Sequence, residues 1–161
     1  MLSKTLEAAL NKQLQMELSS SYIYLAMSAH LAAHHLPGMA HWMVVQHKEE
    51  HDHAAKFVEY MVDQGARVEL EAIEQPPMDY KSALDVFEKA YAHEQKVSAA
   101  IHQIFVQARK EDDYATEGFL SWFVKEQVEE EKNALTIVER LKIVGDSLPG
   151  LLMLDEVLGK R

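Results

Sequence analysis

Residues 43–61 read MVVQHKEEHDHAAKFVEYM, and they place an acid and an imidazole inside an apolar helical stripe. Met43 and Phe57 recur at helical spacing, and Glu50 and His53 fall on the same face between them. Residues three apart on a helix point the same way, so this pair can bind one cation together. A single Glu-x-x-His pair often arises by chance, so its meaning depends on the rest of the chain.

The other half of the chain carries a matching set of polar residues. One constant shift along the sequence superimposes the two sets, and every member interrupts an apolar stripe of its helix. Two helical hairpins that present the same constellation are expected when a pseudo-two-fold axis passes through one central site. The two sets, in order, are Glu17, Glu50 and His53, and then Glu94, Gln127 and Glu130.

Acids on the core side of a helix need a counter-charge. Each ionised carboxylate loses much of its hydration when it is buried, and several of them together repel one another. A divalent cation removes both costs. Oxygen ligands with one imidazole suit iron or manganese better than structural zinc, and one Glu plus Glu-x-x-His across a bundle is typical of di-iron and di-manganese proteins.

The periodicity predicts an all-α fold, with one domain over residues 1–161 that forms a four-helix bundle with a short fifth helix. A helix of about 27 residues is about 40 Å long, and sixteen extended residues reach roughly 50 Å. The linker can therefore return along the bundle, so that the second and third helices run parallel. We expect helices at about 5–34, 39–65, 82–110, 114–144 and 148–158, with a long crossover at 66–81.

Composition excludes several classes of function. There is no cysteine, so disulfides and thiolate sites are absent from the sequence. A formal net charge of −10 argues against nucleic acid and anionic lipid as partners, although many soluble proteins are acidic for solubility alone. No apolar run approaches the roughly 20 residues that span a membrane. We expect a soluble cytoplasmic protein with no membrane partner.

With these residues in place, the chain resembles the bacterial non-haem ferritins over essentially its full length, which implies a ferritin-like bundle with one long crossover. The resemblance assigns the first iron position to Glu17, Glu50 and His53. It assigns the second to Glu50, Glu94 and Glu130, with Gln127 nearby and Glu50 as the bridge.

The resemblance also implies roles beyond the iron pair. Tyr24 would lie beside the iron as a hydrogen-bond partner and a candidate electron donor, with an ordinary core phenol as the alternative. Glu49, Glu126 and Glu129 are similar to a third iron position described for bacterial ferritins. For Glu129 the alternative is a solvated acidic face, because it belongs to the run Glu129-Glu130-Glu131.

Two departures separate the chain from bacterioferritins, so we expect no haem. Their second hairpin carries another Glu-x-x-His, where this one reads Gln127-x-x-Glu130. Their haem-binding Met directly follows the bridging Glu, where this chain has His51. Rubrerythrins usually add a cysteine-rich iron domain, which a chain without cysteine cannot build. Mini-ferritins place their iron between subunits and lack the fifth helix.

The resemblance implies a ferroxidase that oxidises Fe(II) with dioxygen or peroxide and stores the ferric mineral in a hollow homo-oligomer of 24 subunits. One alternative is a di-iron carboxylate oxidase or peroxidase that acts on an organic substrate and does not assemble as a storage cage. The other alternative is a structural bundle with incidental metal affinity.

Overall fold

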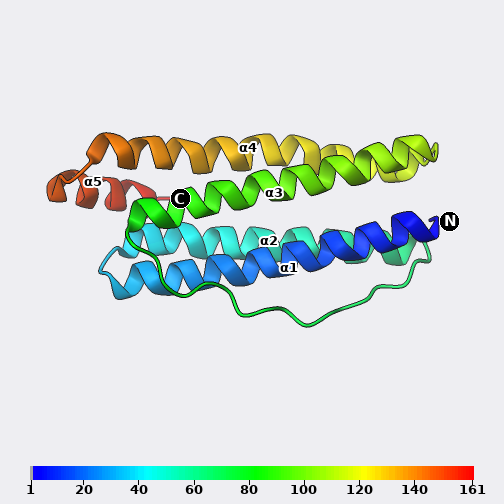
Figure 1. Ribbon diagram of the computed structural model, residues 1–161, viewed down its shortest axis with the longest axis horizontal. Helices are drawn as coiled ribbons and strands as arrows, with labels where there is room; N and C mark the ends of the chain where they lie inside the picture. The colour runs from blue at the N-terminus through cyan, green and yellow to red at the C-terminus, as the bar shows by residue number, and fades with distance from the viewer. Residues whose placement is uncertain (1) are drawn as a thin grey trace.

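The computed structural model describes residues 2–161, and this range contains five helices and no strand. Four long helices lie side by side, and the fifth packs at one end of the bundle against α2 and α4 (Figure 1). The predicted all-α bundle with a short fifth helix is therefore confirmed. The helices are α1 (Lys4–Ala33), α2 (Pro37–Asp63), α3 (Ala83–Lys110), α4 (Tyr114–Val144) and α5 (Leu148–Leu158).

Most helices begin where a side chain can accept a hydrogen bond from the first turn. Ser3 caps α1, Ser82 caps α3, Asp113 caps α4 and Ser147 caps α5. Helix α2 is the exception, since the side chain of its N-cap residue, Leu36, has no atom that can accept a hydrogen bond. It begins at Pro37, two residues before the predicted start, because proline suits the first position of a helix.

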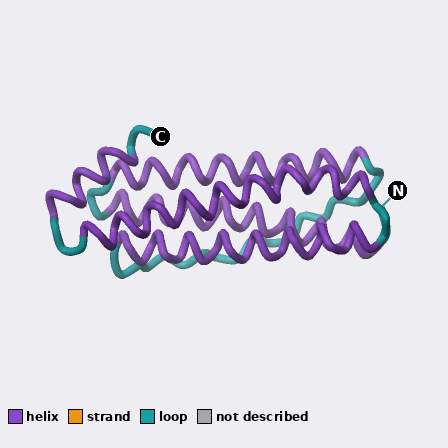
Figure 2. Tube along the Cα trace, turned by 90° about the horizontal axis from the view of Figure 1, so that it is seen from above, coloured by secondary structure: helices purple, strands orange, loops and turns teal. Residues whose placement is uncertain are grey.

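The segment between α2 and α3 runs outside the bundle from one end to the other (Figures 1 and 2). Helix α1 holds this segment through side chains. Asn11 Nδ2 donates to Arg67 O at 2.9 Å, and Gln15 Nε2 donates to Ala72 O at 2.9 Å. The crossover makes α2 and α3 parallel. Equivalent positions of the α1–α2 hairpin and the α3–α4 hairpin therefore lie at the same level along the bundle.

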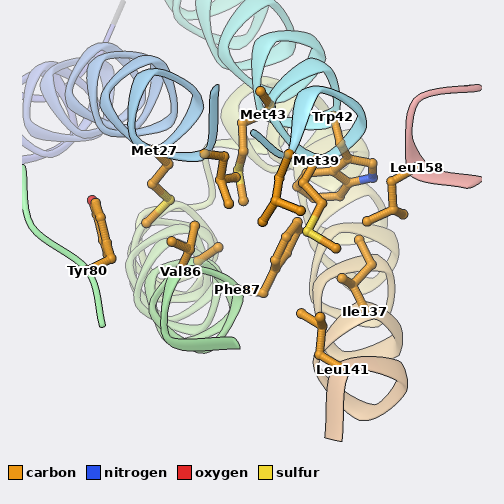
Figure 3. Close-up of a cluster of buried hydrophobic side chains, with 14 of the residues drawn as sticks. Met27, Met39, Trp42, Met43, Tyr80, Val86, Phe87, Ile137, Leu141 and Leu158 are labelled. Carbon is orange, nitrogen blue, oxygen red and sulfur yellow. The ribbon is translucent and has the colours of Figure 1, made fainter. Parts of the chain in front are cut away.

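The apolar core is divided into two clusters, one at each end of the bundle. The cluster near α5 contains Trp42 and Phe87, which meet edge to face at 5.4 Å between ring centroids (Figure 3). The cluster at the other end contains Phe57 and Phe123, at 4.5 Å. The polar residues that interrupt the stripes lie between the clusters, so the middle of the bundle is the place for a site. None of the helices in residues 2–161 has the length and apolar character that a membrane span requires.

Candidate metal centre

Helices α1 and α2 bring three predicted ligands together at the middle of the bundle. One ligand atom from each of Glu17, Glu50 and His53 lies within 4.8 Å of the others. His53 Nδ1 is 3.9 Å from Glu17 Oε2 and 3.6 Å from Glu50 Oε2. All three side chains are buried, with no more than 4% of the residue surface exposed. The three residues predicted for the first iron position therefore form a compact, buried set of candidate ligands.

Helices α3 and α4 contribute the second half of the centre. Glu94 and Glu130 are buried, and one ligand atom of Glu130 lies within 4.8 Å of one on His53. Gln127 Nε2 donates to Glu94 Oε2 at 3.0 Å, and the Tyr24 hydroxyl donates to Glu94 Oε1. The predicted residues of both hairpins thus meet in one central cluster.

Several atoms at the centre that could bind a metal have no hydrogen-bond partner within the protein. Glu17 Oε2, Glu50 Oε1 and His53 Nδ1 are all buried and make no hydrogen bond. Buried polar atoms are almost always paired, so three unpaired atoms within one cluster of side chains require an explanation. Two carboxylate oxygens and an imidazole nitrogen are suitable ligands for a divalent cation such as iron. The donor set therefore fits the metal that the sequence pattern predicts.

Burial also changes the acidity of the carboxyl groups. Burial, and then the neighbouring charge of Glu50, raises the pKa of Glu17 well above its ordinary value. Burial, and then the charge of Glu94, raises the pKa of Glu50 well above its ordinary value and the pKa of Glu130 to about 7. Without metal, these raised pKa values favour the protonated carboxyl groups. A bound cation favours the charged carboxylates and displaces those protons.

Comparison with known proteins is consistent with this geometry. The family described as Ferritin-like domain matches residues 7–144. The chain belongs to the ferritin family. The bacterial non-heme ferritin of Bacteroides fragilis is 38% identical over 161 residues, covering both chains completely. That of Campylobacter jejuni is 37% identical over 158 residues, 98% of this chain and 95% of the relative.

Solved ferritin structures share the fold closely. The open pore ferritin from the hyperthermophilic archaeon Archaeoglobus fulgidus superimposes with a TM-score of 0.99 at 42% identity, covering 100% of this chain and 99% of that one. An engineered closed form of the same ferritin gives a TM-score of 0.98 at 42% identity, covering 100% and 98%. The agreement extends over the whole chain, α5 included.

The three residues predicted for a third iron position in this ferritin have different surroundings. Glu126 is half-buried, and its ligand atom lies within 4.8 Å of those of His53 and Glu130. Glu49 instead accepts a hydrogen bond from Arg161 Nη2 at 2.6 Å. Glu129 is exposed and belongs to neither group of candidate ligands in the described chain. The structure therefore brings Glu126 to the centre, pairs Glu49 with Arg161, and leaves Glu129 exposed.

Two buried amides of this ferritin were missed by sequence reasoning. Gln13 Nε2 donates to Glu17 Oε1 at 2.7 Å, and Gln46 Nε2 donates to Glu130 Oε2 at 2.6 Å. Gln13 lies one helical turn before Glu17, and Gln46 lies one turn before Glu50. The same periodicity that predicts the ligands could therefore have predicted these neighbours.

Aromatic and imidazole groups surround the centre. The rings of His53 and Trp122 meet edge to face at 5.4 Å. Where α3 packs against α1, His93 Nε2 lies 2.7 Å from Ser20 Oγ. The centroid of the His93 ring is 6.1 Å from that of Tyr24. Burial, with a smaller effect of Lys96, lowers the pKa of His93 to about 4. His93 is therefore neutral at physiological pH and adds no charge behind Tyr24.

Proposed function

We propose that this ferritin oxidises Fe(II) at a di-iron centre within each subunit and stores the ferric product as mineral in a hollow shell of 24 copies. The observation that carries the proposal is the set of orphaned buried ligand atoms on Glu17, Glu50 and His53. The family and the full-length relatives support iron storage as the context.

In this proposal, the side chains form two adjacent iron positions. Glu17 and His53 bind the first Fe(II), Glu94 and Glu130 bind the second, and Glu50 lies between them. Binding requires ionised carboxylates, so the protons that burial retains on the acids are released as Fe(II) enters. Two Fe(II) ions supply two electrons, which reduce dioxygen to hydrogen peroxide or one peroxide molecule to water.

Gln127 explains why the oxidised product can leave. This residue occupies the place where a second hairpin with full symmetry would carry another carboxylate. Its amide donates hydrogen bonds to Glu94 and Ser98 and adds no negative charge. The second position therefore holds ferric iron less tightly than a four-carboxylate site would, which suits transfer to a mineral.

A cavity of about 830 Å³ between α1 and α3 favours a second candidate, an oxidase or peroxidase acting on an organic substrate. Gln13 and His93 line this cavity, so it approaches the centre from the α1 and α3 side. Size-exclusion chromatography with iron loading separates the candidates. A large cage that retains far more iron than two ions per subunit supports storage, whereas a small oligomer that retains only its bound ions supports the oxidase.

The centre itself is tested by substitution. We expect Glu17→Ala, Glu50→Ala and His53→Ala to abolish rapid Fe(II) oxidation, measured by ferric absorbance after anaerobic Fe(II) is mixed with oxygen. Glu59→Ala is the matched control, because Glu59 is an exposed acid on α2, away from the ligands. Unchanged rapid oxidation in all three variants would rule out the proposed centre.

A further inference from the structure

Helix α5 is fixed to the start of α2 by a buried acid. Asp155 Oδ1 accepts a hydrogen bond from Met39 N at 2.7 Å, and Asp155 Oδ2 accepts one from Gly38 N at 3.1 Å. Asp155 therefore supplies the cap that Leu36 cannot provide. Leu158 joins the apolar cluster beside Trp42 (Figure 3). The residues after α5 are consequently held at a defined place along α2.

The side chain of Arg161 lies on one stripe of α2 and makes three contacts there. Its guanidinium carbon is 4.5 Å from the centroid of the Trp42 ring. Nη1 donates to Gln46 Oε1 at 2.5 Å, and Nη2 donates to Glu49 Oε2 at 2.6 Å. The Arg161 carbonyl is also 3.0 Å from His41 Nε2. Ordering a long arginine side chain costs conformational entropy, and these contacts offset that cost.

The contact with Gln46 connects Arg161 to the metal centre. A guanidinium has only donors, so the amide oxygen of Gln46 must face Arg161. The amide nitrogen then faces the other way, and it donates to Glu130 Oε2 at 2.6 Å. Arg161 thus orients Gln46 toward one predicted iron ligand and pairs directly with another, Glu49.

We propose that Arg161 is a positioning residue that competes with metal for Glu49, so that an ion enters the third iron position only as the guanidinium withdraws. This inference rests on the proposed function, in particular on a third position that uses Glu49, Glu126 and Glu129. The Arg161 guanidinium repels a metal ion that approaches the Glu49 carboxylate. Arg161 therefore weakens the third position, and an ion there passes on toward the mineral instead of remaining bound.

The test measures metal binding with Zn(II), which is not oxidised, on the assembled protein by titration calorimetry. Arg161→Ala is expected to tighten the third Zn(II) equivalent per subunit about threefold, the size expected when one partly exposed ion pair is lost. Arg161→Lys keeps a cation in place and is expected to restore weak binding. Lys160→Ala is the matched control, since Lys160 pairs with Glu156 and not with a predicted ligand.

The outcomes separate this inference from the proposed function. A third equivalent that binds equally well in wild type and Arg161→Ala would overturn the role of Arg161 and leave the di-iron centre in place. Two equivalents in every variant would overturn both the third position and the role of Arg161. Anomalous scattering from Zn(II)-soaked crystals gives a second readout, with higher occupancy at Glu49 expected in Arg161→Ala than in wild type.

Discussion

The Tyr24 hydroxyl on α1 donates a hydrogen bond to the Glu94 carboxylate on α3. Both side chains are buried. Burial, and then the charges of Glu94 and Glu50, raises the pKa of Tyr24 well above its ordinary value, so the hydroxyl keeps its proton at neutral pH. The bond therefore remains a donor contact to a predicted iron ligand, and it joins the two hairpins across the centre.

Loss of this hydroxyl is expected to slow oxidation without unfolding the bundle. Tyr24→Phe keeps the buried ring but leaves Glu94 without one of its two side-chain donors. We expect the initial rate of Fe(II) oxidation to fall about tenfold, the lower end of the effect of losing a partner that orients a metal ligand. Stopped-flow absorbance measures the rate. Tyr22→Phe, on the exposed side of α1, is the control, and equal rates in the two variants would contradict the role of Tyr24.

In the metal-free protein, the stability that Glu130 contributes is expected to fall as pH rises from about 4.5 to 7. The pKa of Glu130 is about 7 in the folded protein, against an ordinary value of 4.5. Between these values the folded state binds more protons than the unfolded state, so its stability falls with rising pH, by at most roughly 3 kcal/mol. The thermal midpoint of metal-free protein across this range, followed by scanning fluorimetry, measures the effect.

Glu130→Gln is the comparison that isolates this effect. His93 has a pKa of about 4 and contributes the opposite slope below its ordinary value of 6.5, but it does so in both proteins. The difference in thermal midpoint, variant minus wild type, should therefore grow as pH rises toward 7. A difference that stays constant over this range would show that Glu130 has no raised pKa.

Adding a carboxylate on α4 is expected to separate metal affinity from turnover. In Gln127→Glu, the donors to Glu94 are lost and a second acid faces it, so the metal-free thermal midpoint should fall. With metal, the extra charge should tighten the second position and retain ferric iron. We expect the first addition of two Fe(II) per subunit to be oxidised at near the wild-type rate, and a second addition to be oxidised several-fold more slowly. Equal rates for both additions would contradict the role given to Gln127.

The candidate ligands of the centre were predictable because helical periodicity fixes which residues face the core. Glu50 and His53 on α2 could be placed together from their spacing alone, and Glu17 followed from the repeat of the pattern. The family resemblance supplied Tyr24, and the structure places its hydroxyl on Glu94. These are relations within helices or between equivalent positions of two similar hairpins.

The contacts made by α5 could not be predicted in the same way. Asp155 bonds to the backbone of Gly38 and Met39, and Arg161 reaches Gln46, across more than 100 residues of sequence. Neither periodicity nor spacing links such positions, because they depend on how α5 turns back after Gly145. An acid on a short helix, and an arginine three residues after that helix ends, look like ordinary surface charge until the fold places them.

The docking of α5 is expected to be sensitive to one glycine. A Cβ added at Gly38 would overlap the backbone carbonyl of Asp155, which belongs to the helix that caps α2. Gly38→Ala should therefore push α5 away, weaken both hydrogen bonds to Asp155, and destabilise the protein by about 1–3 kcal/mol.

Gly118→Ala is the matched control, because a Cβ at Gly118 of α4 meets nothing within 4 Å. Alanine is a better helix former than glycine, so this variant should be as stable as wild type or more stable, by up to about 1 kcal/mol. Thermal unfolding of the two variants measures the contrast. If Gly38→Ala also matched wild type, the close packing of α5 on α2 would be wrong, and Arg161 would lose the support that holds it beside Glu49.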